Sequence, residues 1–539
     1  MRRLILIVAT LCSLPLALVA APRRPALAVL IVVDQMRADY LTRFRAHWTG
    51  GLKRLVDEGA SFSEGAYPYL STVTCVGHST IGTGTLPLTH GVVQNTWVDR
   101  RTGAVVPCTD DPSVDAVNYS GEATAHYGVA RLRVPTFGDA IRANGGHVVA
   151  LALKARSAMM LAGRGGDAVT WASDAMDGWQ TSTQYAQAPV SAVAAYVQAH
   201  PIDADAGQTW TLSLPASRYA ASDDVASEDP PSGWGRTFPH PLGRPTGTAK
   251  DRTAFYDRWQ QSPFADAYVA RMAASLADTF ELGRHAQPDL LAVSFSTPDL
   301  LGHNYGPDSR EVEDAYVRLD ASIGTLLAAL DRSVGRGRYV VALSADHGVA
   351  ALPEVATAAG RDAGRASGSA AVAAVNAAVA AQLGADVKAD ARLTGTEVTL
   401  RPDVMARLSA TPGAVEAVAR ALAAQPGVRR VFSAAALTAP AAPTTDADLI
   451  AARLSYMPGV SGDFLVALKE GWIFSTSGTT HGSANAYDQR VPVLLYGTGI
   501  RRGRPRAAAT PADLTPTLAH LTGVPFPSAT GRVLREALR

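Results

Sequence analysis

The stretch RYVVALSADHG, residues 338–348, is a short apolar run that ends abruptly at Asp346 and His347. A run this short is typical of a strand buried on both faces of a sheet. The same pattern recurs in ALAVLIVVD (26–34), GHVVALALKAR (146–156) and DLLAVSFSTPD (289–299). Helical patterns, such as that of residues 311–332, lie between the runs. This alternation predicts an α/β fold with a mostly parallel central sheet flanked by helices.

The polar residues that end these runs indicate where a functional site lies. In open α/β sheets, ligands bind beyond the carboxyl ends of the strands. Each of the four runs places ionisable residues there, namely Asp34, Lys154, Arg156, Asp299, Asp346 and His347. We therefore expect these side chains at one edge of the sheet.

Three carboxylates and two or three imidazoles form a candidate set of metal ligands. In DLLGH (299–303), a helical turn would bring Asp299 and His303 to the same face, a spacing that suits one metal ion. His481, just before the apolar run VPVLLYG (491–497), adds an imidazole. A set without cysteine favours catalytic zinc or another divalent transition metal over structural zinc. Three crowded carboxylates would repel unless cations neutralised them, so the expected number of metal ions is two.

The stretch TVTCVGHSTIGTG, residues 72–84, combines glycines with small hydroxyl residues. It predicts a tight start of a helix, whose first backbone N–H groups attract phosphate. A hydroxyl coordinated to a metal at that position could act as a nucleophile. Helix capping explains most hydroxyls in such a stretch. Residue chemistry alone does not choose among Thr72, Thr74, Ser79, Thr80, Thr83 and Thr85.

Lys154 and Arg156 bear on the class of phosphate ester. We expect the two residues on an extended stretch, where residues two apart point the same way. Two cations directed at one phosphoryl group favour a monoester dianion, which carries one more charge and one more unsubstituted oxygen than a diester. A solvated strand end is the commoner role of such a tripeptide, and only the neighbouring motifs argue against it.

These motifs together resemble the alkaline phosphatase superfamily, especially its threonine-nucleophile phosphate monoesterases of the PafA-like, phosphate-irrepressible type. The resemblance extends from Asp34 to the stretch DLTPTLAHLTGVPFP (513–527). It implies that Thr74 is the nucleophile and that Asn95, Lys154 and Arg156 contact the phosphoryl oxygens. It also implies two Zn²⁺ ions, with other divalent metals possible, one held by Asp34, Thr74, Asp346 and His347 and the other by Asp299, His303 and His481.

The resemblance implies an alkaline phosphatase that hydrolyses small-molecule phosphate monoesters through a covalent phosphothreonine. One alternative is a phosphodiesterase or nucleotide pyrophosphatase of the same superfamily. Such enzymes resemble this chain in the metal ligands and the asparagine, but typically lack the Lys-x-Arg pair. Another alternative is a non-catalytic metal-binding or phosphate-binding protein, against which the complete ligand set and nucleophile argue.

The chain divides into four predicted parts. Residues 1–21 have two arginines, an apolar run and small residues, as in a signal peptide. Residues 22–350 and 471–539 are expected to form the catalytic core, with an irregular insertion at about 205–250 that is rich in Pro, Gly and Trp. The Ala-rich segment 351–470 has helical and strand-like patterns and is expected to be an inserted α/β subdomain.

Charge and composition restrict the partners and the location. Lys and Arg number 49 against 48 Asp and Glu, a net charge of +1, and no basic stripe occurs, so nucleic acid is not an expected partner. Nothing in the sequence indicates an obligatory protein partner. No apolar segment after the signal peptide is long enough for a stable membrane span, so we expect a periplasmic or secreted enzyme. Cys75 and Cys108 could pair there, although sequence does not decide it.

Overall fold

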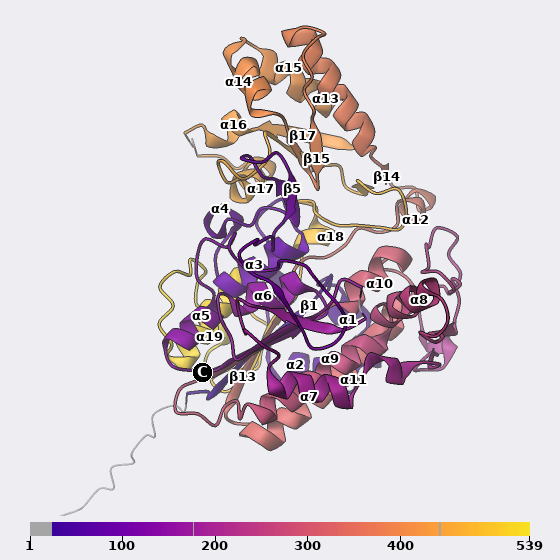
Figure 1. The fold of residues 1–539 in the computed structure, drawn as a ribbon, viewed down its shortest axis with the longest axis vertical. Coiled ribbons are helices and arrows are strands. Elements are labelled where there is room, and N and C mark those ends of the chain that lie inside the picture. Colours follow the sequence, from indigo (N-terminus) through magenta and orange to yellow (C-terminus); the bar gives the residue numbers. More distant parts are fainter. Residues whose placement is uncertain (1–23, 176, 441–442) are drawn as a thin grey trace, which may run out of the picture.

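The computed structural model describes residues 24–175, 177–440 and 443–539 (Figure 1). The predicted signal peptide at residues 1–21 lies outside the described residues. Two bodies are visible in Figure 1, a large lower part around a central sheet and a smaller upper part that contains α13, α14 and α15.

The central sheet has nine described strands, and its middle is parallel. The five parallel strands are, in spatial order, β13 (Tyr339–Ser344), β1 (Leu27–Val33), β12 (Asp289–Phe295), β7 (Val148–Ala152) and β8 (Ala168–Ala172). Antiparallel strands complete both margins, with β20 (Val493–Gly497) and β2 (Ala60–Ser61) beyond β13, and β9 (Trp179–Ser182) and β6 (Ala116–Asn118) beyond β8. The prediction of an α/β fold is confirmed, and the four apolar runs are the four adjacent central strands.

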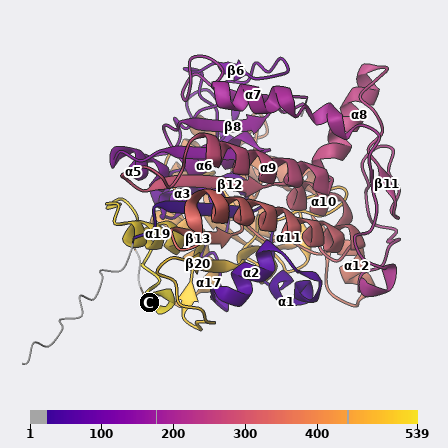
Figure 2. The same ribbon diagram turned by 90° about the horizontal axis from the view of Figure 1, so that it is seen from below.

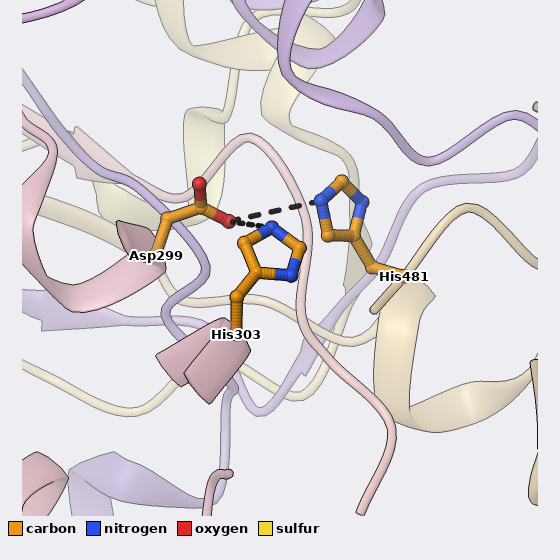
Figure 3. Close-up of side chains that lie close together, drawn as sticks. All are labelled: Asp299, His303 and His481. Carbon is orange, nitrogen blue, oxygen red and sulfur yellow. Dashed lines mark ion pairs between the residues drawn. The ribbon is translucent and has the colours of Figure 1, made fainter. Parts of the chain in front are cut away.

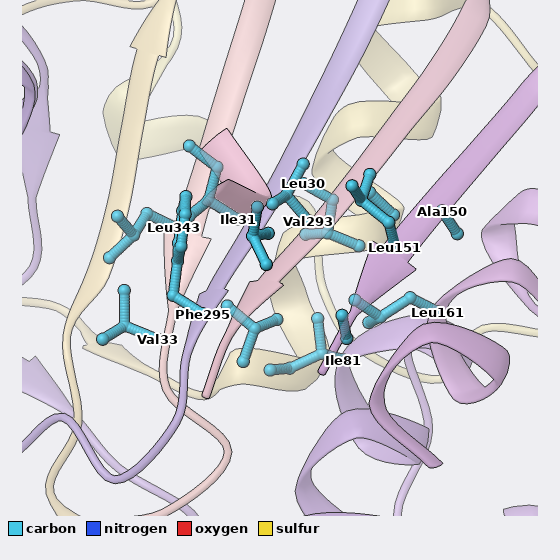
Figure 4. Close-up of a cluster of buried hydrophobic side chains, with 14 of the residues drawn as sticks. Leu30, Ile31, Val33, Ile81, Ala150, Leu151, Leu161, Val293, Phe295 and Leu343 are labelled. Carbon is cyan, nitrogen blue, oxygen red and sulfur yellow. The ribbon is translucent and has the colours of Figure 1, made fainter. Parts of the chain in front are cut away.

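The register of these strands brings their polar ends to one level. All seven residues of β1 are buried, and Val32 is paired with Ser294 on one side and Ser344 on the other. The backbone N–H of Asp34 donates to the carbonyl of Phe295 at 2.9 Å, which extends the ladder to the first residue after β1. Apolar side chains such as Leu30, Val293 and Leu151 fill the layer beside the sheet (Figure 4).

Helices pack on both faces of the sheet (Figure 2). One face carries α3 (Thr74–Thr83), α5 (Phe137–Ala143), α6 (Ala155–Ala162) and α19 (Leu514–Thr522). The opposite face carries α2 (Gly51–Glu58), α9 (Pro263–Thr279) and α11 (Arg310–Leu330), with α10 (Thr297–Tyr305) packed on α11. The apolar positions of α11 face this layer, as the helical pattern of residues 311–332 predicts.

The upper part has a separate antiparallel sheet and its own apolar cluster. Its strands are, in order, β15 (Arg392–Thr394), β16 (Glu397–Thr399), β18 (Phe464–Leu468) and β17 (Val428–Ser433). The helices α13 (Gly368–Leu383), α14 (Pro402–Ala410) and α15 (Ala414–Ala423) pack together against this sheet and share its cluster of buried residues. The exact division between core and insertion at 351–470 stays a prediction.

Short elements complete the described chain. Residues 205–250 contain little regular structure beyond the two-residue strands β10 (Thr209–Trp210) and β11 (His240–Pro241). Other strands are β3 (Glu64–Gly65), β4 (Thr96–Val98), β5 (Val105–Pro107), β14 (Gly364–Arg365), β19 (Trp472–Ile473) and β21 (Ala508–Ala509). Other helices are α1 (Tyr40–Arg43), α4 (Pro87–His90), α7 (Ser191–Ala199), α8 (Ala249–Gln260), α12 (Pro353–Ala358), α16 (Ala434–Thr438), α17 (Ala447–Ser455) and α18 (Ala486–Gln489). Within the described ranges, every helix is too short or too polar to span a bilayer.

Helix α3 lies unusually close to the end of β13. Gly77 on α3 packs against the backbone of Asp346, and a Cβ atom at residue 77 would collide with the Asp346 carbonyl oxygen. A disulfide between Cys75 and Cys108 joins the first turn of α3 to the loop after β5. Both features fix the start of α3 beside the polar edge of the sheet.

We expect the Gly77→Ala substitution to destabilise the protein by about 1–3 kcal/mol, because the added methyl group forces α3 away from Asp346. In an unobstructed helix the same substitution would stabilise by about 1 kcal/mol. Urea unfolding measures the difference, and Gly337→Ala is the control, since no atom lies within 4 Å of a Cβ there. Unchanged stability of Gly77→Ala would contradict the close packing.

Candidate functional site

Six of the predicted ligands form two groups at the carboxyl edge of the sheet. Asp34, Asp346 and His347 form the first group, in which the ligand atoms lie within 4.8 Å of one another. Asp299, His303 and His481 form the second group by the same measure (Figure 3). The residues come from the ends of β1 and β13, from α10 and from the loop before α18.

The second group is built on one turn of helix α10. Asp299 and His303 lie one turn apart, as the spacing predicts, and His303 Nε2 is 3.2 Å from Asp299 Oδ1. His481 Nε2 lies 3.7 Å from the same oxygen (Figure 3). Two imidazole nitrogens and one carboxylate oxygen thus converge on a common point.

The three histidines of the two ligand groups share one orientation, in which Nδ1 faces a backbone carbonyl oxygen and Nε2 is left for a ligand. The Nδ1 atoms of His303, His347 and His481 lie 2.8, 2.9 and 2.8 Å from the carbonyl oxygens of Thr479, Gly348 and Thr72 respectively. A carbonyl oxygen can only accept, so Nδ1 carries the proton and the Nε2 lone pair is left for a ligand. Burial, with the charge of nearby His347, lowers the pKa of His481 well below its usual value, which keeps it neutral.

The first group contains buried carboxylate oxygens that lack donors. Asp346 Oδ1 accepts hydrogen bonds from the backbone N–H groups of Gln35 and His347, at 3.1 and 3.0 Å. Asp34 Oδ1 and Asp346 Oδ2 have no hydrogen-bond donor among the described residues. Burial and the neighbouring Asp346 raise the pKa of Asp34 well above its usual range. Uncompensated buried oxygens of this kind fit a site for a divalent cation.

Lys154 connects the two groups. Its Nζ donates to Asp34 Oδ2 at 2.6 Å and also to Asp299 Oδ2. Burial lowers the pKa of Lys154, but the charges of Asp299 and Asp34 more than offset this effect, so its pKa is raised overall. In turn, although burial raises the pKa of Asp299, Lys154 and His303 hold it well below the usual range. The ammonium therefore stays charged beside both groups.

The expectation that Lys154 and Arg156 share an extended stretch is wrong. Strand β7 ends at Ala152, Lys154 precedes the helix α6, and Arg156 is the second residue of that helix. The chain turns into the helix as soon as it leaves the sheet, so side-chain alternation does not apply. The charge of Arg156 acts to lower the pKa of Lys154, although less than Asp299 and Asp34 act to raise it. Arg156 Nε is buried and has no hydrogen-bond partner among the described residues.

Thr74 is the first residue of α3, and its Oγ1 lies 3.4 Å from Nε2 of His347. Four of the other hydroxyls in this stretch are hydrogen-bonded elsewhere. Thr72 Oγ1 donates to the carbonyl of Ser483, and Thr83 Oγ1 donates to that of Ser79, while the hydroxyls of Thr80 and Thr85 bond to other side chains. Ser79 Oγ has no hydrogen-bond partner among the described residues, and of the six hydroxyls only that of Thr74 has a hydrogen-bond contact with a predicted metal ligand there.

Asn95 is fixed beside Thr74 by two hydrogen bonds. Its Oδ1 accepts from the backbone N–H of Cys75 at 2.8 Å, and its carbonyl accepts from the N–H of Cys108 at 2.9 Å. The disulfide between these two cysteines closes the arrangement. Because the amide oxygen is engaged, the NH₂ group of Asn95 is the part that can donate to a ligand.

Gln35 is a residue of this site that the sequence analysis missed. Its Nε2 donates to Asp299 Oδ1 at 2.7 Å, while its backbone N–H donates to Asp346, so one residue contacts both ligand groups. Its φ of 66° lies in the left-handed region, which costs energy for a residue other than glycine. Gly302 leaves room for its side chain, since a Cβ there would strike Gln35 Oε1. Only its position directly after Asp34 could have indicated this role.

Comparisons with known proteins find relatives along nearly the whole chain. The family model described as type I phosphodiesterase / nucleotide pyrophosphatase matches residues 28–490. The alkaline phosphatase PafA of Elizabethkingia meningoseptica is 31% identical over 96% of this chain and 95% of its own length. The alkaline phosphatase PhoV of Synechococcus elongatus is 29% identical over 96% of this chain and 93% of its own length. The crystal structure of wild-type alkaline phosphatase PafA superimposes with a TM-score of 0.85 at 30% identity, covering 96% of this chain and all of that one.

We expect Gln35→Ala and Gln35→Gly to weaken zinc binding at the second group roughly tenfold to a hundredfold, because both remove the donor that orients Asp299. Competition with a chromogenic chelator measures the affinity. Glycine tolerates the φ of 66° and alanine does not, so the pair separates the lost hydrogen bond from backbone strain. Wild-type affinity in Gln35→Gly would contradict an orienting role.

Proposed function

The chain belongs to the type I phosphodiesterase / nucleotide pyrophosphatase family of the alkaline phosphatase superfamily, and from this membership we propose that it is an alkaline phosphatase specific for phosphate monoesters. The observation that carries the proposal is the Lys154 ammonium, held between the two ligand groups with Arg156 nearby. Two fixed cations at one phosphoryl position favour a dianionic monoester over a diester. The family description also names nucleotide pyrophosphatases, and this function is the alternative. The pair of Lys154 and Arg156 argues against it.

Seven residues are proposed to hold two divalent metal ions. Asp34, Thr74, Asp346 and His347 would bind one ion, and Asp299, His303 and His481 the other. The donor set contains carboxylates and neutral imidazoles but no thiolate, which fits zinc at a catalytic site. When bound, the two ions would favour the deprotonated form of the Thr74 hydroxyl and neutralise charge on the leaving oxygen.

The proposed reaction has two displacements at phosphorus. In the first, the Thr74 hydroxyl gives its proton to solvent and its Oγ1 forms a bond to phosphorus while the bond from phosphorus to the ester oxygen breaks, and the leaving alkoxide takes a proton from water. In the second, water attacks the phosphothreonine, phosphate departs, and Thr74 recovers its hydroxyl proton. Lys154, Arg156 and the NH₂ group of Asn95 would hold the non-bridging oxygens throughout. The contacts of Lys154 with Asp34 and of Asn95 with the backbone of Cys75 support the assignment of these two residues. Arg156 is included because it follows Lys154 by two residues, at the start of α6.

Export of the enzyme is a further part of the proposal. It is supported by the pattern of residues 1–21 and by the disulfide between Cys75 and Cys108, which suits an oxidising compartment. The physiological setting would then be the periplasm or the medium, where small phosphate monoesters are the substrates.

We expect Thr74→Ala to lower kcat for an aryl phosphate by about a thousandfold or more, because no other hydroxyl replaces the nucleophile. Steady-state kinetics and metal analysis of the same sample measure the loss and the retained zinc. Thr74→Ser keeps a hydroxyl and is the matched control, which should retain substantial turnover. Full activity of Thr74→Ala would reject the nucleophile.

We expect the double variant Lys154→Ala/Arg156→Ala to lose about a hundredfold or more in kcat/KM for p-nitrophenyl phosphate, and far less for methyl p-nitrophenyl phosphate. The reason is that the diester lacks the oxygen and the charge that these cations contact. Arg142→Ala on α5 is the control, since Arg142 pairs with Asp167. An equal loss for both esters would argue for a structural role of the pair and against monoester selectivity.

A further inference from the structure

A cavity of about 280 Å³ lies beside the second ligand group. His303, His481 and Asn95 line it, whereas the first ligand group, Lys154 and Arg156 do not. In the proposed reaction, a metal ion held by the second group would neutralise the charge on the leaving oxygen. The cavity therefore begins where the leaving group would depart.

The far wall of this cavity belongs to the upper part of the molecule. Gly395 and Thr396 between β15 and β16 and Leu468 at the end of β18 come from the upper part, and Trp472, Ile473 and Phe474, which follow β18 on the return of the chain to the core, complete this wall. The two parts are joined at the cavity, since Gln94 Nε2 from the core donates to Thr396 Oγ1 at 3.4 Å. Gly395 has a φ of 57°, and a Cβ there would press on the side chain of Gln94.

Trp472 is held in one orientation by its surroundings. Its indole Nε1 donates to Asp362 Oδ1 at 3.0 Å. The ring packs against Gly364 and Gly427, at both of which a Cβ atom would collide with it. Phe474, two residues on, is partly buried against the apolar cluster of the upper sheet. Rigid aromatic side chains of this kind offer contact area at little cost in side-chain entropy.

The cavity lining lacks the charges that a second anionic group would need. Among the described residues that line it there is no lysine or arginine. The one carboxylate, Asp488, is 1% exposed and already accepts hydrogen bonds from the N–H and hydroxyl of Ser483. An anionic leaving group would have to give up its hydration here without an ionic partner, which is unfavourable.

We infer that this cavity binds the leaving group of the substrate and selects phosphate monoesters whose leaving group is uncharged and carries an aromatic or other hydrocarbon portion. The inference rests on the proposed monoesterase function. It assigns Trp472 and Phe474 to substrate selection, and it gives the upper part of the molecule a role distinct from the chemistry of the core.

The test compares three monoesters in the metal-loaded full-length enzyme: ethyl phosphate, benzyl phosphate and 4-carboxybenzyl phosphate. The two benzyl esters differ by one remote carboxylate and have leaving alcohols of similar acidity. We expect kcat/KM to be roughly tenfold or more higher for benzyl phosphate than for either of the others. Trp472→Ala should reduce the ratio of kcat/KM for benzyl phosphate to kcat/KM for ethyl phosphate about tenfold. Phe474→Arg should raise kcat/KM for 4-carboxybenzyl phosphate relative to that for benzyl phosphate about tenfold.

Controls separate the possible outcomes. Ile450→Ala changes an apolar side chain on α17 that is 38% exposed and does not line the cavity, and it should leave both ratios unchanged. Phe474→Leu, which keeps an apolar side chain, provides a milder variant should the arginine disturb folding, and it should lower the ratio of benzyl to ethyl phosphate. Wild-type ratios in Trp472→Ala and Phe474→Leu would overturn the inference. Failure of the wild-type enzyme to hydrolyse any of the three esters would instead overturn the proposed function.

Discussion

The central constraint of this structure is the crowding of three buried carboxylates at one edge of a parallel sheet. Asp34 follows β1 directly, Asp346 follows the adjacent strand β13 by two residues, and Asp299 follows β12, on the other side of β1, by four residues. Like charges at this separation, removed from water, are unfavourable without compensating cations. Lys154 supplies one compensating charge to Asp34 and Asp299. Compensation is incomplete at one carboxylate oxygen of Asp34 and one of Asp346, which have no hydrogen-bond donor among the described residues. Both residues are proposed metal ligands.

The same constraint explains why so much backbone is used to orient side chains. Three imidazoles are held by backbone carbonyl oxygens from three separate loops, so their orientation depends directly on the path of the backbone. The start of α3 is fixed by the contact of Gly77 with Asp346 and by the disulfide of Cys75. Thr74 thus reaches His347 through rigid elements, which is the preorganisation that electrostatic catalysis requires.

The positions of the carboxylates could be predicted from sequence because parallel strands end at a common edge, so an acidic residue after each apolar run implies proximity. The same reasoning failed for Arg156, where helix α6 begins earlier than the apolar pattern indicates. The choice of Thr74 rested on family resemblance, since several hydroxyls share its stretch and only three-dimensional contacts distinguish them. Gln35 could not be found, because its role depends on a left-handed backbone conformation that no residue type announces. The pairing of Cys75 with Cys108 likewise depends on a distance that sequence spacing does not give.

The two parts of the molecule differ in the chemistry that they bring to the site. The core contributes the two ligand groups and Lys154, and most of these residues come from strand ends and helix starts whose positions the sheet determines. The upper part contributes glycine, threonine and apolar side chains to the adjoining cavity. Substitutions in the uncharged wall of the cavity leave the balance of charge among the buried carboxylates unchanged. Substitutions of the charged core residues alter that balance. Selectivity for the leaving group can therefore vary through residues such as Trp472 and Phe474, while the arrangement around Lys154 must remain the same.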